Sequence, residues 1–450
     1  MNPRLPLLAA LTLVQPVAVC TAENPASKPN ILFIVADDMG YADCGVQGCK
    51  DIPTPNLDAL AREGIRFTDG YVTGPVCSPS RASLLTGRYH YRDGIHNWVQ
   101  PGKPGLNSQV PTVASYLKSA GYHTGLIGKW HLGEQTECHP MRRGFDEFFG
   151  FLGGECHYFP NQPKSANAKK NHSTQMLRGY EPVNVKSYTT DDFGQEAVDF
   201  IQRRKDSKEP FFLCLAFNAV HTPMESPENY LARFPNIVDK KRRTYAGMLS
   251  SMDDNIGRVL QAVSDAGLEK NTLICFLSDN GGPTTRNAPN ASINTPLRGG
   301  KGQTWEGGIR VPMFMKWTGH LSPGTYSQPV IQMDLATTAL ALAGVMPDEH
   351  WRQDGVNLLP FLTGDKGEPH PMLCWDFENQ WAIRKGPWKL VFAGPEKGEK
   401  EPSLALYDLT KDISESNNLS ARHPDVVEQL QSDWQQWNKE VVLNKPKSTP

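Results

Sequence analysis

Four short apolar runs along the chain each stop abruptly at polar residues. They span residues 31–36, 124–128, 211–217 and 273–277. None of them alternates apolar with polar positions, a pattern typical of the central strands of a parallel sheet that helices cover on both faces. Apolar residues recur at helical spacing in residues 56–63, 113–120, 191–203 and 245–266. The alternation predicts an α/β fold, a doubly wound and mostly parallel sheet with helices on both faces.

The pattern changes after residue 347. Short apolar segments at 372–377, 380–384, 388–393 and 404–409 are separated by turn residues, as in an antiparallel meander. Pro424 then opens a stretch with a single apolar stripe, which predicts a terminal helix. We therefore divide the chain into a large domain over residues 28–347 and a smaller C-terminal α+β subdomain, with an antiparallel sheet, over residues 348–450.

The amino-terminus has the pattern of a secretory signal peptide. Arg4 precedes an apolar run over residues 5–19, and the small residues Cys20, Thr21 and Ala22 follow it. The run is shorter than the roughly 20 residues that a membrane-spanning helix needs, and no later segment is long and apolar enough to span. We expect residues 1–22 to direct the protein to the periplasm or out of the cell, with a lipid anchor at Cys20 as the alternative.

Charge and cysteine content narrow the class of protein. The 450 residues carry 46 Lys plus Arg against 48 Asp plus Glu, a net charge of −2. This balance removes the usual electrostatic reason to expect a nucleic-acid partner or an anionic membrane. Nine cysteines are compatible with an oxidising compartment but form no dense framework. Cys44 with Cys49, and Cys138 with Cys156, are possible disulfides.

The polar residues that follow the four strands carry the candidate chemistry. Ligands of a doubly wound sheet bind outside the carboxyl ends of its strands. Four of these residues offer the hard oxygen ligands that Ca²⁺ and Mg²⁺ prefer, namely Asp37, Asp38, Asp279 and Asn280. Lys129 offers positive charge, and His131 and His221 are acid–base candidates at the ends of strands.

The sharpest local motif is Cys77-Ser78-Pro79-Ser80-Arg81, which continues through Ala82 to Thr86-Gly87-Arg88. It predicts a turn that leads into a helix, with Cys77 at the positive N-terminal end. Such a position lowers the pKa of a thiol and favours anions. A helix-capping turn with an incidental cysteine is one alternative. A plain cysteine nucleophile is another, although it leaves the carboxylates elsewhere unexplained.

This motif resembles the signature of the formylglycine-dependent (type I) sulfatases, members of the alkaline-phosphatase-like superfamily. Further blocks resemble the same family and occur in the same order: Asp37-Asp38, Gly128-Lys129-Trp130-His131-Leu132-Gly133, His221-Thr222-Pro223, Ser278-Asp279-Asn280-Gly281, Gly299-Gly300-Lys301 and Leu406-Tyr407-Asp408-Leu409. In general look the chain is similar to bacterial secreted carbohydrate sulfatases. The resemblance identifies residues 28–347 as the catalytic sulfatase domain.

The resemblance implies a modified residue and a metal. A maturation enzyme of the family oxidises the motif cysteine, here Cys77, to the aldehyde formylglycine. The family generally uses calcium, with magnesium also possible. The implied ligands are the modified residue and the oxygen set of the strand ends: Asp37, Asp38, Cys77, Asp279 and Asn280.

The resemblance also implies a covalent mechanism. One hydroxyl of the hydrated aldehyde at position 77 attacks sulfur, and Asp279 accepts its proton. His221, with Lys301, protonates the departing alcohol, and His131 then helps to expel sulfate. The charge of the sulfate is held by three cations: Arg81, Lys129 and Lys301.

The sequence indicates less about the substrate than about the reaction. Residues 153–184 form a polar segment that reads equally well as a surface loop or as a lid over the substrate. The candidate substrate contacts come from this segment and from the neighbouring blocks, and they are His90, His96, His157, Arg178 and Arg298. Trp98 lies beside His96 in the sequence. Such residues suit a sulfated sugar and also an aryl sulfate.

We expect hydrolysis of sulfate esters on a poly- or oligosaccharide. A broad arylsulfatase is the first alternative. A phosphonate monoester or phosphodiester hydrolase of the same superfamily is the second. A glycan-binding protein without activity is a third, which the intact set of motif residues disfavours.

Overall fold

The computed structural model describes residues 28–159, 175–185, 187–284, 289–364, 367–394 and 402–443. The predicted signal peptide, including Cys20, lies outside the described residues, so its prediction stays open. Among the described residues, the model contains no helix with the length and apolar character that a membrane crossing requires.

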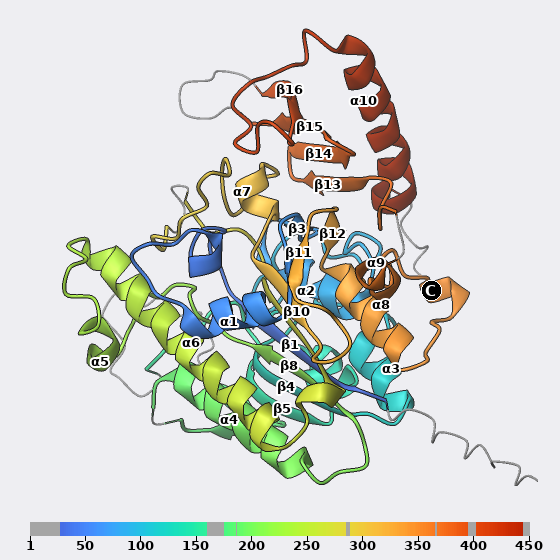
Figure 1. The fold of residues 1–450 in the computed structure, drawn as a ribbon. Helices are drawn as coiled ribbons and strands as arrows, with labels where there is room; N and C mark the ends of the chain where they lie inside the picture. The colour runs from blue at the N-terminus through green and yellow to red at the C-terminus, as the bar shows by residue number, and fades with distance from the viewer. Residues whose placement is uncertain are drawn as a thin grey trace, which may run out of the picture.

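A large sheet crosses the middle of the molecule (Figure 1). Within the described residues it has ten strands, in the order β11 (Gly324–Tyr326), β2 (Ile65–Phe67), β10 (Met313–Lys316), β9 (Thr272–Ser278), β1 (Asn30–Ala36), β8 (Phe211–Ala216), β4 (His123–Lys129), β5 (Glu147–Phe151), β6 (Met176–Arg178) and β7 (Glu181–Val183). The five central strands from β9 to β5 run parallel. Antiparallel strands flank them, β10 beside β9 and β6 beside β5.

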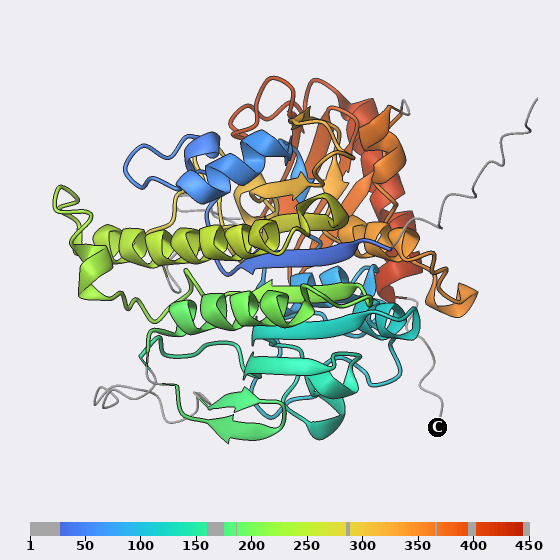
Figure 2. The same ribbon diagram turned by 60° about the horizontal axis from the view of Figure 1, so that its bottom comes forward.

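Helices cover both faces of this sheet (Figure 2). One face packs on α1 (Pro55–Glu63), α4 (Thr189–Arg204) and α6 (Lys240–Asp265). The other packs on α2 (Cys77–Thr86), α3 (Val113–Ser119) and α8 (Met333–Leu342). Alternate residues of each central strand enter the two cores: in β1, Leu32 and Ile34 face one, and Ile31 and Phe33 the other. Burial on both faces explains why these strands are apolar throughout.

A smaller unit lies above the large sheet in Figure 1. Its antiparallel strands are β13 (Leu373–Phe377), β14 (Gln380–Lys385), β15 (Trp388–Ala393) and β16 (Ser403–Asp408), paired in chain order. Helix α10 (Pro424–Asn438) packs against them. A two-stranded ladder of β3 (Gly70–Tyr71) and β12 (Val330–Ile331) supplies residues to the core under this unit.

Short helices complete the described part of the chain. The α-helices are α5 (Glu228–Leu231), α7 (Glu306–Ile309) and α9 (Leu359–Thr363). Five 3₁₀ turns and one π-helical turn join the longer elements: η1 (Gly45–Gln47), η2 (Thr136–Cys138), η3 (Pro140–Arg142), η4 (Glu269–Asn271), η5 (Glu349–Trp351) and η6 (Lys439–Leu443).

The predicted fold class is confirmed. The four predicted strands are β1, β4, β8 and β9, which are neighbours at the centre of the sheet. The meander and the terminal helix are also present. The two possible disulfides do not form, because all eight cysteines that the structure describes are free thiols. The boundary between residues 347 and 348 stays a prediction.

Candidate active site

The carboxyl ends of the central parallel strands bring the predicted polar residues together. Asp37 and Asp38 follow β1, Asp279 follows β9, and Lys129 is the last residue of β4. Backbone hydrogen bonds continue the sheet past these ends: the Asp37 amide donates to the Ala219 carbonyl at 2.9 Å, and the Asp279 amide donates to the Ala36 carbonyl at 3.0 Å. The strand ends therefore hold the side chains on a rigid frame.

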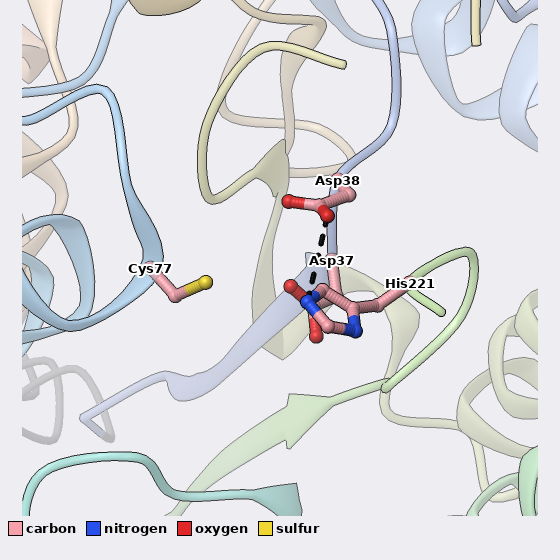
Figure 3. Close-up of side chains that lie close together, drawn as sticks. All are labelled: Asp37, Asp38, Cys77 and His221. Atoms are coloured by element: carbon pink, nitrogen blue, oxygen red, sulfur yellow. Dashed lines mark ion pairs between the residues drawn. The ribbon is translucent and has the colours of Figure 1, made fainter. Parts of the chain in front are cut away.

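Cys77 is the first residue of α2, as the sequence predicts, and every residue of this helix is buried. Figure 3 shows its side chain pointing from the helix end toward Asp37 and Asp38. Its Sγ lies 3.4 Å from Lys301 Nζ. Burial raises the pKa of the Cys77 thiol, and the cations Lys129 and Lys301 offset only part of that effect. The expectation of a lowered thiol pKa at this helix end is therefore wrong, which weakens the plain cysteine nucleophile.

Cations pair with the buried carboxylates around Cys77. Lys129 Nζ lies 2.6 Å from Asp37 Oδ2, and neither side chain is exposed. Lys301 Nζ lies 2.6 Å from Asp38 Oδ1. Burial would raise the pKa of Asp38, but Lys301 and the other nearby cationic groups lower it well below its ordinary value. Asp38 remains a carboxylate through the neutral range.

Arg81 holds the third carboxylate from the following turn of α2. Its Nε donates to Asp279 Oδ2 at 2.9 Å, and its Nη1 donates to the Lys129 carbonyl at 3.0 Å. Burial, together with the charge of Asp37, raises the pKa of Asp279 to about 6 even though Arg81 opposes the shift. Asp279 therefore titrates close to neutrality and is suited to accept a proton.

One group of side chains has the spacing of a metal site. Oxygen, sulfur and nitrogen atoms of Asp37, Asp38, Cys77 and His221 all lie within 4.8 Å of one another (Figure 3). The sequence predicted His221 as an acid–base residue outside the metal set. Asp279, which the sequence predicted as a ligand, is engaged by Arg81 and accepts the Asp38 amide at 3.3 Å.

Asn280, the remaining predicted ligand, lies against Asp38. Its Nδ2 donates to Asp38 Oδ1 at 2.7 Å. Its Oδ1 is buried and has no hydrogen-bond partner, and the same holds for Asp37 Oδ1. Buried polar atoms are paired in nearly all native proteins. The two unpaired oxygens therefore mark a place where a further group is required.

His221 faces the same place. Its Nδ1 lies 2.6 Å from the Thr222 carbonyl oxygen, which can only accept, so Nδ1 carries a hydrogen. In the neutral ring, Nε2 then holds a lone pair, and this atom faces Asp38 Oδ2 at 3.6 Å. A lone pair opposite a carboxylate is repulsive unless a proton or a cation lies between them. Burial lowers the pKa of His221 to about 4 despite the attraction of Asp38.

His131 lies on the other side of the cluster, after β4. It has a left-handed backbone, with φ of 57°. Its Nε2 lies 3.2 Å from the Val99 carbonyl, and its Nδ1 is buried without a partner. Burial and the nearby Lys129 hold the pKa of His131 well below its ordinary value. The ring is therefore neutral in the described state.

One predicted substrate contact, His90, is corrected by the structure, and Arg178 is held by an ion pair. The His90 side chain has no exposed surface, and its ring nitrogens lie 2.6 Å from the Ile95 carbonyl and 3.2 Å from the Thr73 carbonyl. It ties the end of α2 to the following loop and is closed to a ligand. Arg178 forms two hydrogen bonds with Glu196 of α4, at 2.8 and 2.6 Å. Since 54% of its side chain is exposed, Arg178 stays a predicted substrate contact.

The other three predicted contacts differ in their surroundings. His96 is exposed on the loop after α2. His157 Nδ1 lies 2.9 Å from Glu225 Oε1, and 30% of its side chain is exposed. Arg298 lies over the Trp305 ring, 3.8 Å from its centroid, and donates to Tyr407 Oη at 3.2 Å. Arg298 thus contacts the C-terminal sheet, whereas His96 and His157 keep open surface for a ligand.

Asn290, which was not predicted from the sequence, supports the cluster through its side-chain amide. Its Nδ2 donates to the Asp38 carbonyl at 3.2 Å and to the Val220 carbonyl at 2.9 Å. It thereby joins the loops after β1 and β8, and it helps to hold Asp38 in a left-handed conformation with φ of 63°. Nothing in the sequence marks this asparagine as a site residue, because its partners are 252 and 70 residues away in the chain.

Comparisons with known proteins agree with this geometry. The sulfatase family model matches residues 29–345. N-acetylgalactosamine-6-sulfatase of Canis lupus familiaris is 36% identical over 400 residues, which cover 85% of this chain and 75% of the relative. Arylsulfatase A of Homo sapiens is 33% identical over 453 residues, covering 90% and 87%.

Solved structures show the same likeness. The structure of Ps i-CgsB in complex with k-i-k-neocarrahexaose superposes with a TM-score of 0.84 at 37% identity, covering 94% of this chain and 95% of that one. Phosphonate monoester hydrolase of Agrobacterium radiobacter shares the fold, with a TM-score of 0.65 at 21% identity over 92% of this chain and 96% of that one. The family match, the relatives and the fold all agree: this chain belongs to the sulfatase family, the enzymes that hydrolyse sulfuric esters.

Proposed function

We propose that this sulfuric ester hydrolase removes sulfate from a sulfated poly- or oligosaccharide. The observation that carries the proposal is the cluster of Arg81, Lys129 and Lys301 around the buried Cys77 at the carboxyl ends of the central strands. Support for a carbohydrate comes from the relatives, one of which is named for an amino sugar and another of which holds a neocarrahexaose. Another relative is named as an arylsulfatase, so hydrolysis of a broad range of aryl sulfates is the alternative proposal.

The site is suited to a divalent cation, for which calcium is our first choice and magnesium the second. The donor set is rich in hard oxygens, and the unpaired Asp37 Oδ1 and Asn280 Oδ1 are available to it. Asp37, Asp38 and Asn280 would hold the ion, with position 77 and Asp279 beside it. When bound, the ion would neutralise charge on the sulfate group.

Cys77 is suited to the modification that the family signature implies. Its Sγ points into the cluster, and its own pKa is raised, so an unmodified thiol is a poor nucleophile here. Conversion to formylglycine, followed by addition of water to the aldehyde, would supply a hydroxyl as the nucleophile for attack on sulfur. We propose that a formylglycine-generating enzyme is therefore a maturation partner of this chain.

The remaining residues of the cluster have two roles, binding of the sulfate charge and transfer of protons. Arg81, Lys129 and Lys301 present positive charge where the negative charge of a sulfate ester must be held. Asp279, with a pKa of about 6, accepts a proton at position 77. His221 would deliver a proton to the departing oxygen from its protonated form, with the second proton on Nε2 beside Asp38, and Lys301 lies next to it on Asp38. His131, neutral and with a free Nδ1, accepts a proton in the release of sulfate.

The amino-terminal segment supports the further proposal that the enzyme is exported, to the periplasm or out of the cell. Residues 1–22 have the basic start, apolar core and small-residue end of a signal peptide. An exported enzyme would meet polymeric glycans directly. A lipid anchor through Cys20 remains the alternative form.

The test combines a mass measurement with a substrate comparison. Protein from the native host is digested with trypsin, and the mass of the peptide of residues 67–81 is measured; we expect replacement of CH₂–SH by CHO at Cys77. Sulfate release is then compared for sulfated oligosaccharides, 4-nitrophenyl sulfate and the matched phosphate and phosphonate esters, with Cys77→Ala as the inactive control. Activity on the aryl sulfate alone would contradict the carbohydrate substrate and favour the arylsulfatase alternative. Active protein with an unmodified thiol would contradict the proposed role of Cys77.

A further inference from the structure

We propose that Trp98 is a platform on which a pyranose ring of the substrate stacks, at the rim of the active site. This inference rests on the proposed carbohydrate substrate and adds a specificity-determining residue to it. An indole ring offers a flat apolar face to the C–H groups of a sugar, and neighbouring polar groups bind its hydroxyls.

The exposure of Trp98 is unusual in this molecule. Of the residues that the structure describes, five large apolar side chains are conspicuously exposed: Trp98 (46%), Tyr180 (51%), Val238 (92%), Ile293 (37%) and Met346 (92%). Trp98 is the one tryptophan among them. Leaving nearly half of an indole in water forgoes stabilisation that burial would provide. A single exposed apolar side chain is common on protein surfaces, so it is the place of Trp98 beside the catalytic cluster that points to a ligand.

Hydrogen bonds of Val99 place the segment that carries Trp98 beside the reactive residue. The next residue, Val99, donates its amide to Ser78 Oγ at 2.9 Å, and Ser78 directly follows Cys77. The Val99 carbonyl lies 3.2 Å from His131 Nε2. The backbone on one side of Trp98 is thus fixed to both ends of the catalytic cluster.

The other side of Trp98 is fixed to the C-terminal unit. The Trp98 amide donates to Asn97 Oδ1 at 2.7 Å, and Asn97 Nδ2 donates to Glu378 Oε1 at 2.9 Å. Glu378 and Asn379 form the exposed turn between β13 and β14. A surface held on both sides loses little conformational entropy when a ligand binds. The exposed carboxylate and amide of the turn can bind sugar hydroxyls next to the indole.

Trp98→Ala and Trp98→Phe test the platform, with Tyr180→Ala as the matched control. Tyr180 is equally exposed but lies on the turn between β6 and β7, where it stacks on His139 with 4.4 Å between the ring centroids. Steady-state kinetics are measured on a sulfated oligosaccharide and on 4-nitrophenyl sulfate. Inhibition by inorganic sulfate reports on the anion site.

We expect Trp98→Ala to raise the KM for the oligosaccharide about tenfold, a typical effect for an aromatic contact of this size. The increase should exceed that for the aryl sulfate at least fivefold, with the inhibition constant of sulfate within about twofold of the wild type. Trp98→Phe should recover most of the affinity, and Tyr180→Ala should change neither KM.

Other outcomes separate the two proposals. A wild-type enzyme that hydrolyses the oligosaccharide, with an unchanged KM in Trp98→Ala, would overturn the platform and leave the carbohydrate substrate standing. Equal KM increases for both substrates, or a sulfate inhibition constant that rises in parallel, would assign Trp98 to loop structure and overturn it as well. A wild-type enzyme that cleaves only the aryl sulfate would overturn the carbohydrate substrate, and the platform with it.

Discussion

Replacing Lys389 with methionine would leave two buried carboxylates without the cation that they share. Lys389 Nζ lies 2.9 Å from Glu306 Oε1 and 2.7 Å from Glu415 Oε1, and none of the three side chains is exposed. Glu306 keeps other partners, because Tyr71 Oη donates to it at 2.7 Å and Arg310 lies 3.2 Å away. Among the described residues, Glu415 keeps one hydrogen-bond donor, the Glu306 backbone amide at 2.7 Å.

The loss should therefore fall mainly on Glu415. Removing one partner of a buried ion pair costs about 3–5 kcal/mol, because the other charge is left without compensation in a dry site. We expect Lys389→Met to lower the free energy of unfolding by about that amount at pH 8. Adding Glu415→Gln removes the uncompensated charge, so the double variant should recover about 2–3 kcal/mol of the loss.

The penalty should depend on pH. Burial raises the pKa of Glu415 to about 7 although Lys389 opposes the shift. The folded state thus holds a proton that the unfolded state has lost between about pH 4.5 and pH 7, so stability falls as the pH rises through this window. Without Lys389 the pKa rises further. The deficit of Lys389→Met should therefore grow between pH 5 and pH 8 by at most about 1.4 kcal/mol, because the wild type itself loses this stability up to a pKa of about 7.

Urea unfolding at pH 5 and pH 8 measures the free energy of unfolding of the wild type, the two single variants and the double variant. The far-UV circular dichroism of the folded baselines confirms that each variant reaches the native fold before urea is added. A Lys389→Met deficit below about 1 kcal/mol at pH 8 would show that water compensates Glu415. Additive losses in the double variant, with no recovery, would show that Lys389 and Glu415 do not share one interaction.

Three further predictions test the site. A chelator should lower the melting temperature of the wild type, and calcium should restore it, whereas Asp37→Ala should respond to neither; a wild type indifferent to the chelator would contradict the metal site. His221→Ala should lower kcat about 10²- to 10⁴-fold on a sugar sulfate, and much less on 4-nitrophenyl sulfate, whose leaving group needs no proton; equal losses would remove its role as a proton donor. His90→Ala should cost about 1–3 kcal/mol of stability and leave KM within about twofold of the wild type; a clearly raised KM would restore His90 as a substrate contact.

The central strands could be predicted because their burial is visible in the sequence as continuous apolar runs. β1, β4, β8 and β9 are buried on both faces and so are apolar throughout. The edge strands leave no such mark. β10 has four residues, and β6 and β7 have three each, too few for a periodic pattern, so the sequence analysis did not find them.

The same distinction applies to the site. Asp37 and Lys129 were found because each stands where a strand ends, and such ends meet at one edge of a parallel sheet. Nearness in sequence to the Cys77 motif was a poorer guide. It does not say which way a side chain points, and His90 points into the core. Asn290 was missed because only the folded chain brings it to Asp38.

The ion pairs of Lys389 also bear on how the site itself is held. Glu306, which Lys389 binds, begins α7 immediately after the loop that carries Lys301. At the start of β14, Gln380 Nε2 donates to the Gly302 carbonyl at 3.1 Å, and its Oε1 accepts the Thr304 amide at 3.3 Å. Two residues of the C-terminal sheet therefore clamp the segment that places Lys301 Nζ 3.4 Å from Cys77 Sγ. The large domain also holds this segment, because the Lys301 amide donates to the Gly282 carbonyl at 3.2 Å and the Gly302 amide donates to the Pro75 carbonyl at 2.9 Å. Since a displacement of about 1 Å can cost two orders of magnitude in rate, the contacts from the C-terminal sheet make that sheet part of the active-site scaffold.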